Sequence, residues 1–308
     1  MSSGLRISSQ EWIVSGVVVS VVIPSFNGMP YLAATVQSVL DQSYSDLQIV
    51  ISDGGSTDDT LAYLATINDP RVRVIHCPLP GAAANWTYAC AAATGEFTKL
   101  VCQDDLLYPH NVAEQVEQLI REPRAVMAIS SRDIINAHGK VIYRNRGVMG
   151  LPAGLVPGID ALRASYHKGT NILGEPFAVL FRTSELQQAL PWDDSAPLML
   201  DLAMYQRVLD PMTPKSDPDS RFVVVGKTPV GAFRVSSHSW STRIAEQQVH
   251  QFRYWQKSFE ATEREMGRPL TSRDQTRAFI GRHVEAAKRR SAYKYLRLRR
   301  TISNPETG

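Results

Sequence analysis

Short apolar runs alternate with amphipathic stretches along the first 130 residues of the chain. The apolar runs predict strands at Val17–Ile23, Leu47–Ser52, Val72–Cys77, Phe97–Cys102 and Ala125–Ser130. The stretches between them predict helices at about residues 30–41, 58–67, 82–94 and 109–121. Runs that are apolar without simple alternation indicate strands covered on both faces. The sequence therefore predicts an α/β fold with a mostly parallel, Rossmann-like central sheet flanked by helices.

The regular alternation is lost after residue 130. Arg132–Tyr143 predicts a hairpin that turns at His138-Gly139, and the Gly- and Pro-rich stretch Gly147–Pro157 is typical of a substrate loop. A strand is expected at Phe222–Val225, and helices are expected at about 183–190, 200–209, 243–266 and 272–299. In the last of these, Ser272-Arg-Asp-Gln275 has the pattern of a capping box.

These patterns divide the chain into four parts. We expect an N-terminal extension (1–16), a ligand-binding half (17–130), a second half of the same domain (131–240) and a C-terminal helical, basic segment (241–308). Composition is that of an ordinary globular protein, with 44% hydrophobic and 20% charged residues among 308. The three cysteines have neither metal-ligand spacing nor an even count, which predicts reduced thiols in the cytoplasm.

The positive charge is concentrated near the C-terminus. Residues 281–300 contain eight Lys or Arg and one Glu, so this segment carries +7, whereas the whole chain carries +3 and the remainder therefore −4. Such a segment either contacts an anionic membrane surface, peripherally at the inner face of the cell membrane, or is a solvated helix end. No recognised nucleic-acid-binding module accompanies the charge, so no nucleic-acid partner is expected.

Four of the predicted strands lead into polar residues. The polar segments are Pro24-Ser-Phe-Asn-Gly28, Ser52-Asp-Gly-Gly-Ser56, Gly81-Ala-Ala-Ala-Asn85-Trp86 and Gln103-Asp-Asp105. Ligands of α/β sheets gather beyond the carboxyl ends of strands, where one or two carboxylates suffice to bind Mg2+ together with substrate phosphates. Asp53 is suited to accept hydrogen bonds from a base or ribose, although each segment also fits a turn or a helix cap. No Gly-x-Gly-x-x-Gly follows the first strand, which disfavours a dinucleotide dehydrogenase.

The same segments resemble a known family. Val21–Gly28, Gln37–Tyr44 and Ile49–Thr60 are similar to the opening of family-two glycosyltransferases, and Gly95–Asp105 resembles that family's run into its Asp-x-Asp motif. The resemblance covers residues 17–110 well and is thinner at 174–182, 201–207 and 233–238. It implies a GT-A fold that transfers a sugar from a nucleoside diphosphate with inversion.

The resemblance also implies roles for individual residues. Asp104 matches the metal-binding carboxylate, which would hold Mg2+ or Mn2+ on the donor diphosphate, with His238 as a further metal or diphosphate ligand from a late loop. The chain has Cys102 where the family often has its first Asp, and Gln103 beside the expected ribose. The expected donor-binding residues are Pro24, Ser25, Asn27, Asp53, Asn85, Gln103, Asp104 and Arg234.

An inverting transfer needs one general base for the acceptor hydroxyl. By resemblance, Asp201 is the candidate, and Asp193, Asp194 and Glu175 are its rivals. Trp86, Trp192 and Trp240 either face a sugar ring or belong to the core. The resulting hypothesis is a metal-dependent inverting glycosyltransferase of a bacterial cytoplasm, acting on a glycan, glycolipid or small-molecule hydroxyl. The alternative is a nucleotide-sugar-binding protein without activity, because Cys102 replaces the first Asp of the motif.

Overall fold

A computed structural model describes residues 16–210, 221–236 and 245–298; for Ala245 and residues 295–298 only the backbone is described. Its centre is a ten-stranded sheet with the order β3-β2-β1-β4-β9-β6-β10-β5, to which β7 is added beside β6 and β8 beside β10. The strands are β1 (Val19–Ser25), β2 (Leu47–Asp53), β3 (Val72–His76), β4 (Phe97–Leu100), β5 (Leu106–Leu107), β6 (Ala125–Asn136), β7 (Val141–Arg146), β8 (Gly154–Pro157), β9 (Val179–Arg182) and β10 (Phe222–Val235).

The directions of the strands confirm a mostly parallel sheet. β3, β2, β1 and β4 pair in parallel, and β6 pairs with β10 in parallel. β9 lies antiparallel between β4 and β6, so all six of these strands run the same way. Their carboxyl ends therefore lie at one edge of the sheet. This is the arrangement expected if the polar segments that follow the strands form one ligand site.

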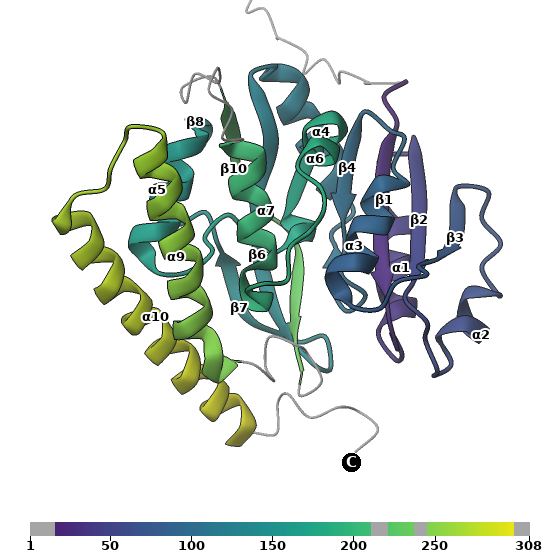
Figure 1. Cartoon of the computed structure of the whole chain (residues 1–308). Coiled ribbons are helices and arrows are strands. Elements are labelled where there is room, and N and C mark those ends of the chain that lie inside the picture. The colour runs from purple at the N-terminus through teal and green to yellow at the C-terminus, as the bar shows by residue number, and fades with distance from the viewer. Residues whose placement is uncertain (1–15, 211–220, 237–244, 299–308) are drawn as a thin grey trace, which may run out of the picture.

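Helices cover both faces of this sheet (Figure 1). They are α1 (Leu32–Leu40), α2 (Thr60–Leu64), α3 (Ala82–Ala91), α4 (Asn111–Arg121), α5 (Gly158–Lys168), α6 (Thr183–Gln188), α7 (Leu200–Leu209), α9 (Gln248–Glu265) and α10 (Ser272–Leu298), with short 3-10 turns η1 (Pro176–Ala178), η2 (Pro197–Met199) and η4 (Ala245–Gln247).

The core consists of two buried layers, one on each side of the sheet. On β1, Val21 belongs to the layer that contains residues of α1 and α4, whereas its neighbour Val22 belongs to the layer that contains residues of α3, α5, α7 and α9. On β2, Ile49 and Val50 divide in the same way. Successive strand residues point to opposite faces, so both faces are apolar because both are covered. This explains why the strand sequences are apolar without alternation.

The segment 131–180 is more regular than expected. The hairpin is confirmed as the end of β6 and β7, with the backbone N–H of Gly139 donating to Asn136 in the turn. However, the segment also contains β8, β9 and α5, which the sequence patterns did not predict. Helix α5 buries Ile159, Leu162 and Tyr166 on one side. The Gly and Pro content just before it concealed this amphipathic spacing.

The second half differs in two further details. β10 continues to Val235, well beyond the expected Phe222–Val225, because it pairs along most of its length with the long strand β6. The capping box of α10 is formed by Thr271 and Asp274, one residue earlier than expected: Asp274 N–H donates to Thr271 Oγ1 (3.2 Å) and Thr271 N–H to Asp274 Oδ2 (3.0 Å). Within the described part of the chain, no helix combines the length and apolar character needed to cross a membrane.

Candidate active site

The ends of β1 and β2 form the first part of the site. Ser25 and Asp53 are paired in register as the last residues of these two strands. The Asp53 carboxylate is 1% exposed, and its Oδ2 accepts hydrogen bonds from the backbone N–H groups of Gly55 (2.9 Å) and Ser56 (3.1 Å). Its Oδ1 is buried and accepts no hydrogen bond from a described residue. A buried carboxylate oxygen without a hydrogen bond costs free energy. Asp53 Oδ1 is therefore suited to accept a hydrogen bond from an N–H or O–H group of a ligand.

Asn85 connects the same two strand ends from helix α3. Its Nδ2 donates to the carbonyl oxygens of Ser25 (3.0 Å) and Ser52 (3.1 Å), and its Oδ1 accepts from Ser52 Oγ (2.6 Å). A side chain at Gly54 would crowd this amide, since an added Cβ would lie 3.0 Å from its nitrogen. The Asn85 amide therefore positions the strand ends, and these bonds leave it little capacity for a ligand.

Gln103 is similarly engaged with the loop after β1. Its Oε1 accepts from Ser25 Oγ (3.0 Å) and from the Phe26 N–H (2.7 Å), while its Nε2 donates to the Phe26 carbonyl (3.0 Å). In the same loop Asn27 is exposed at a φ of 48°, and its Oδ1 accepts from the Thr57 N–H (2.8 Å). Pro24 is buried within β1 and pairs in register with Ser52. The two loops are thus joined into one rigid edge.

The acidic pair after β4 is divided between two environments. Asp104 is partly exposed, whereas Asp105 is fully buried and its Oδ1 accepts from the backbone N–H of Arg234 on β10 (3.1 Å). Burial, and next the negative charge of Asp104, raise the pKa of Asp105 well above its usual value. Asp105 does not cap the following helix, which begins at Asn111. Through this hydrogen bond Asp105 holds residues 103–105, which we call the acidic loop, against β10.

The side chain of Arg234 also holds the acidic loop against β10. Its Nε donates to the Asp104 carbonyl (2.8 Å), its Nη1 donates to the carbonyls of Asn136 (3.3 Å) and Ala137 (3.2 Å), and the guanidinium stacks over Tyr31. The side chain is 4% exposed and burial lowers its pKa. The expected contact of Arg234 with a diphosphate would therefore require these bonds to rearrange.

A cavity of about 500 Å³ opens beside the acidic loop. Cys102, Asp104 and Asp105 line one side of it, and Asp201 lines another. The donor-side residues Ser25, Asn27 and Asp53 are not among its lining residues. Asp104 consequently lies between two regions, the β1–β2 edge and the cavity.

Asp201 occupies the first turn of α7. Its Oδ1 accepts from the Leu202 N–H (2.7 Å) and its Oδ2 from Asn171 Nδ2 (2.7 Å). Burial raises the pKa of Asp201 to about 6, although the two hydrogen bonds and the charges of Arg132 and Arg289 oppose this rise. A carboxylate with such a pKa is ionised at neutral pH and still basic enough to take a proton.

The rival bases lie in less suitable environments. Asp193 and Asp194 are exposed outside the cavity lining, and Asp193 accepts hydrogen bonds from its neighbour Ser195. Glu175 does line the cavity, but it is paired with the buried guanidinium of Arg132 (Nη2 to Oε1, 2.8 Å). Asp201 is therefore the carboxylate of this set best prepared to act as a base.

The tryptophans divide between the cavity and the core. Trp86 lines the cavity, and the ring of Trp192 packs edge-on against it with 5.0 Å between centroids. Trp192 itself is buried and donates from Nε1 to Cys90 Sγ (3.4 Å), so it belongs to the core. Trp240 and His238 lie outside the described residues.

The acidic loop has the chemistry of a divalent metal site. Asp104 offers a partly exposed carboxylate, and Asp105 Oδ2 is buried without a hydrogen-bond partner among the described residues. Burial, and next the charges of Asp105, Asp104 and Asp201, raise the pKa of the Cys102 thiol, and all four residues line the cavity. No group of three or more His, Cys, Asp or Glu residues suited to a metal occurs among the described residues. Carboxylate oxygens completed by substrate phosphates fit Mg2+ or Mn2+.

Several residues of the site were not predicted from the sequence. Asn171 and Arg132 touch or face Asp201, and Arg289 reaches the same cavity from helix α10. Asn171 falls where no element was predicted, and the hairpin predicted from Arg132 onward gave no sign that its side chain lies near Asp201. For Arg289 a signal was present: Glu285, Lys288, Arg289 and Ala292 have the spacing of one helix face.

Comparison with known proteins identifies a family for this chain. The sequence profile described as Glycosyl transferase family 2 matches residues 20–184. An uncharacterized glycosyltransferase of Nostoc sp. is 32% identical over 127 residues, which are 40% of this chain and 39% of that protein. The hyaluronan synthase of Pasteurella multocida is 30% identical over 126 residues, 40% of this chain and 13% of that synthase. The matched region thus spans less than half of these curated relatives.

Solved structures show the same fold. Residues 1–349 of Staphylococcus aureus TarS, in complex with UDP-GlcNAc, superpose with a TM-score of 0.61 at 15% identity, covering 87% of this chain and 72% of that one. The mannosyltransferase PcManGT of Pyrobaculum calidifontis, in complex with GDP-Man and Mn2+, gives a TM-score of 0.54 at 16% identity, covering 91% and 80%. At these identities the likeness extends to the fold, which is the expected GT-A architecture.

Proposed function

The chain belongs to glycosyl transferase family 2, and we propose that it transfers a sugar from a nucleoside diphosphate to an acceptor hydroxyl, with inversion and with the help of a divalent metal. The observation that carries the proposal is that Asp104 and Asp201 line one cavity beside the carboxyl ends of the strands. A metal-binding carboxylate and a base are the two groups that such a transfer requires.

On the donor side, the β1–β2 edge binds the nucleoside. Asp53 Oδ1 accepts a hydrogen bond from the base or the ribose, because it is buried without a partner among the described residues. Asn85 and Gln103 keep Ser25 and the loop after β1 in place through their hydrogen bonds. Two solved structures of the same fold contain UDP-GlcNAc (TarS) and GDP-Man (the mannosyltransferase PcManGT), which supports a nucleotide-sugar donor without fixing its base.

Asp104 would hold Mg2+ or Mn2+ against the donor diphosphate. A metal there stabilises, as a Lewis acid, the negative charge that develops on the departing nucleoside diphosphate. The structure of PcManGT contains Mn2+, which supports a divalent metal in proteins of this fold. Asp105 and Arg234 maintain the acidic loop in position on β10.

Asp201 acts as the general base. The acceptor oxygen attacks the anomeric carbon as its proton passes to the Asp201 carboxylate, so that a new carbon–oxygen bond forms. The bond between the anomeric carbon and the diphosphate oxygen breaks, and its electron pair leaves with the nucleoside diphosphate. A single displacement of this kind inverts the anomeric configuration. Asn171 orients the carboxylate through its 2.7 Å hydrogen bond to Oδ2.

The experiment begins with the donor. Thermal-shift measurements with UDP-, GDP- and dTDP-sugars, with and without Mn2+, identify the nucleotide because a ligand of the folded state raises the melting temperature. Turnover of that donor is then measured over a panel of hydroxyl acceptors. Transfer that requires Mn2+ or Mg2+ and is abolished in Asp201→Asn supports the proposal. Full activity of this variant would refute the role of Asp201.

A nucleotide-sugar-binding protein without activity is the second candidate, and Cys102 in the acidic motif is the observation that favours it. Cys102 lines the cavity next to Asp104. Calorimetric binding of the nucleotide sugar, with no turnover over the acceptor panel and no slow hydrolysis of the donor, would favour this candidate. Contact of residues 281–300 with an anionic membrane stays a prediction.

A further inference from the structure

Helix α10 forms part of the cavity wall. Its lining side chains are Glu285, Lys288, Arg289, Ala292 and Tyr293. Their spacing of three and four residues is that of one helix face. Arg290 and Lys294 of the same helix are exposed and do not line the cavity. The basic C-terminal segment is therefore not a uniformly solvated helix, since one stripe of it faces the cavity.

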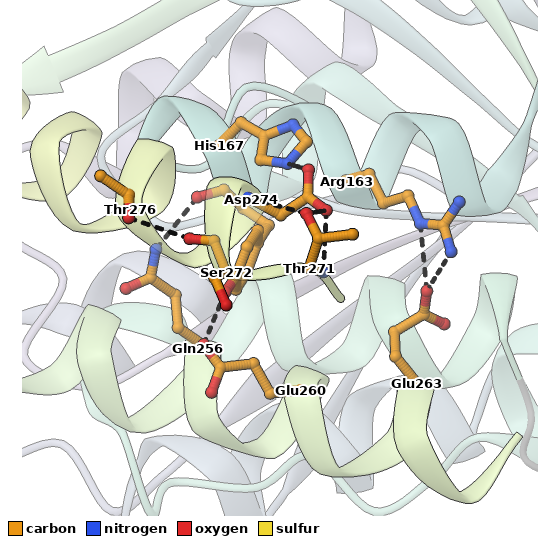
Figure 2. Close-up of polar contacts among 10 residues, drawn as sticks. Arg163, His167, Gln256, Glu260, Glu263, Thr271, Ser272, Asp274 and Thr276 are labelled. Atoms are coloured by element: carbon orange, nitrogen blue, oxygen red, sulfur yellow. Dashed lines mark hydrogen bonds and ion pairs between the residues drawn. The ribbon is translucent and has the colours of Figure 1, made fainter. Parts of the chain in front are cut away.

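The position of α10 is fixed by close contact with α5. A Cβ added to Gly169 would lie 2.0 Å from the backbone nitrogen of Arg282, and one added to Gly281 would lie 2.2 Å from the His167 carbonyl. The two backbones thus approach more closely than any side chain would allow. Figure 2 shows the hydrogen bond between His167 Nε2 and Asp274 Oδ1 at the start of α10 (3.0 Å). This packing of α10 against α5 determines which face of α10, with Glu285, Lys288 and Arg289, is turned toward the cavity.

A second attachment joins α5 to α9. Figure 2 shows Arg163 of α5 donating to the buried Glu263 of α9, with 3.0 Å between Nε and Oε2. Gln256 of α9 donates from Nε2 to the Ala278 carbonyl of α10 (3.3 Å). The three helices therefore form one layer, visible beside the sheet in Figure 1, and α10 is a fixed wall of the cavity.

The lining of the whole cavity is balanced, with five Lys or Arg and five Asp or Glu side chains. Four of the cations are Arg146, Lys168, Lys288 and Arg289, and Glu285 is the carboxylate that α10 contributes beside them. Lys168 and Lys288 share Glu285, at 3.6 and 2.9 Å from Oε1. Neither Arg146 nor Arg289 has a carboxylate of a described residue within 4.0 Å. Two guanidinium groups thus face the cavity without ion-pair partners in the described chain.

We propose that this side of the cavity binds a phosphate group carried by the acceptor, so that the enzyme glycosylates a phosphorylated hydroxyl compound. Guanidinium groups suit phosphate because they donate two parallel hydrogen bonds and stay charged. Tyr143 and Tyr293 line the same region, and their rings are suited to pack against the carbon skeleton of a sugar or polyol. The proposal rests on the proposed function, because it names the acceptor of that transfer.

The position of the phosphate site indicates that the phosphate group belongs to the acceptor and not to the donor. The donor nucleoside is assigned to the β1–β2 edge, whose residues Ser25, Asn27 and Asp53 do not line the cavity. Asp104 lines the cavity and follows Gln103, which is hydrogen-bonded to the loop after β1, and Asp201 lines the cavity together with Arg289, whose charge acts on the Asp201 carboxylate. An anion held by Arg289 therefore lies on the side of the base, where the acceptor hydroxyl must be.

The first test uses inorganic phosphate as the probe. Calorimetry at low salt, without donor or metal, is done on the full chain and on R289A, R146A and R290A. Because hydrogen bonds to charged groups are strong, we expect R289A and R146A each to weaken phosphate binding roughly tenfold or more. R290A is the matched control, with the same charge on the same helix but outside the cavity, and should bind as the unchanged protein does. Equal binding by R289A and R290A would overturn the proposal.

The second test measures turnover with the donor found by thermal shift. The acceptors are matched pairs, ribitol with ribitol phosphate and glucose with glucose phosphate, together with a polyprenyl phosphate in detergent micelles. We expect the phosphorylated members to be preferred and this preference to be lost in R289A but kept in R290A. The soluble and micellar arms distinguish a free phosphate from a lipid headgroup. Equal use of the neutral and phosphorylated members would refute the inference.

The outcomes separate this inference from the proposed function. If no donor binds and nothing is transferred, while phosphate binding depends on Arg289, the sugar transfer is refuted and the anion site stands. If sugar is transferred to neutral acceptors with no effect of R289A, the anion site is refuted and the transfer stands. Binding to phosphatidylglycerol vesicles that falls equally in R289A and R290A, without phosphate binding, would overturn the site in favour of a membrane-contacting surface.

Discussion

Replacing Asp201 by Asn separates its catalytic role from its effect on stability. If Asp201 is the general base, the amide cannot take the proton of the acceptor, and turnover should fall roughly 10²- to 10⁴-fold. The same substitution removes the negative charge of the Asp201 carboxylate, which burial destabilises in the folded protein. We therefore expect the variant to be less active. We also expect the free energy of unfolding of the variant, relative to that of the unchanged protein, to be higher at neutral pH than in acid.

The magnitude follows from the pKa of Asp201. Burial raises this pKa to about 6 from an ordinary value of 3.8, so the folded protein binds the proton more tightly than the unfolded chain does. Below about pH 4 both states are protonated and the charge costs nothing; above about pH 6 the full cost applies. With about 1.4 kcal/mol for each pKa unit, the limit is about 3 kcal/mol. Since Asp201 is partly exposed, we expect about 1 to 3 kcal/mol.

The assay compares urea unfolding of the two proteins at about pH 4 and about pH 7.5. Hydrogen bonds lost by the substitution lower stability at both pH values, so the change between the two pH values isolates the charge. D193N is the control, because the pKa of the exposed Asp193 is lowered by Ser195 and its removal should have a small effect of opposite sign. A free-energy difference for D201N that is the same at both pH values would refute the reasoning.

Four further predictions concern the metal, the donor, the base and the helix layer. Asp104→Ala should lower turnover roughly thousandfold and abolish stimulation by Mn2+, measured by titrating the metal in the transfer assay; retained stimulation would exclude Asp104 as the ligand. Asp53→Asn should weaken donor binding roughly tenfold or more in calorimetry while leaving the melting temperature nearly unchanged, and equal affinity would exclude the contact of Oδ1. Asn171→Ala removes a hydrogen bond that lowers the pKa of Asp201, so the acid limb of the plot of kcat/KM against pH should move to higher pH; an unmoved limb would contradict the orientation of the base by Asn171. Gly169→Ala should destabilise the protein by about 2 kcal/mol or more in thermal or urea unfolding, because its φ is 78° and the added Cβ meets the backbone of α10; an unchanged protein would contradict that packing.

The first half of the fold was predictable because its signals are local. The run Leu47–Ser52 became β2 with one residue added, and the run Val17–Ile23 became β1 with both ends shifted by two residues, since strands buried on both faces are apolar throughout. Helix α5 was missed because its apolar residues follow a Gly- and Pro-rich stretch, and β9 was missed because a run of four residues carries little periodicity. The continuation of β10 to Val235 depends on β6, which no local pattern reveals.

The donor-side residues were predicted in position more successfully than in role. Asn85 and Gln103 do lie at the carboxyl ends of the strands, but their amides bond to protein groups and position the loops. Arg234 is likewise occupied by backbone carbonyls. A sequence pattern identifies a polar residue near a site, whereas the direction of its side chain depends on neighbours that are distant in the chain.

The sequence by itself determined the alternation of strands and helices in residues 17–130 and the presence of Asp53 and Asp104 at strand ends, because hydrophobic period and turn composition are properties of neighbouring residues. Only the tertiary structure decided that Arg289 faces the cavity of Asp201. That arrangement depends on the contact of α10 with α5 at Gly169, a packing between segments far apart in sequence. The pKa of Asp201 also follows from this packing, because burial and distant charges determine it.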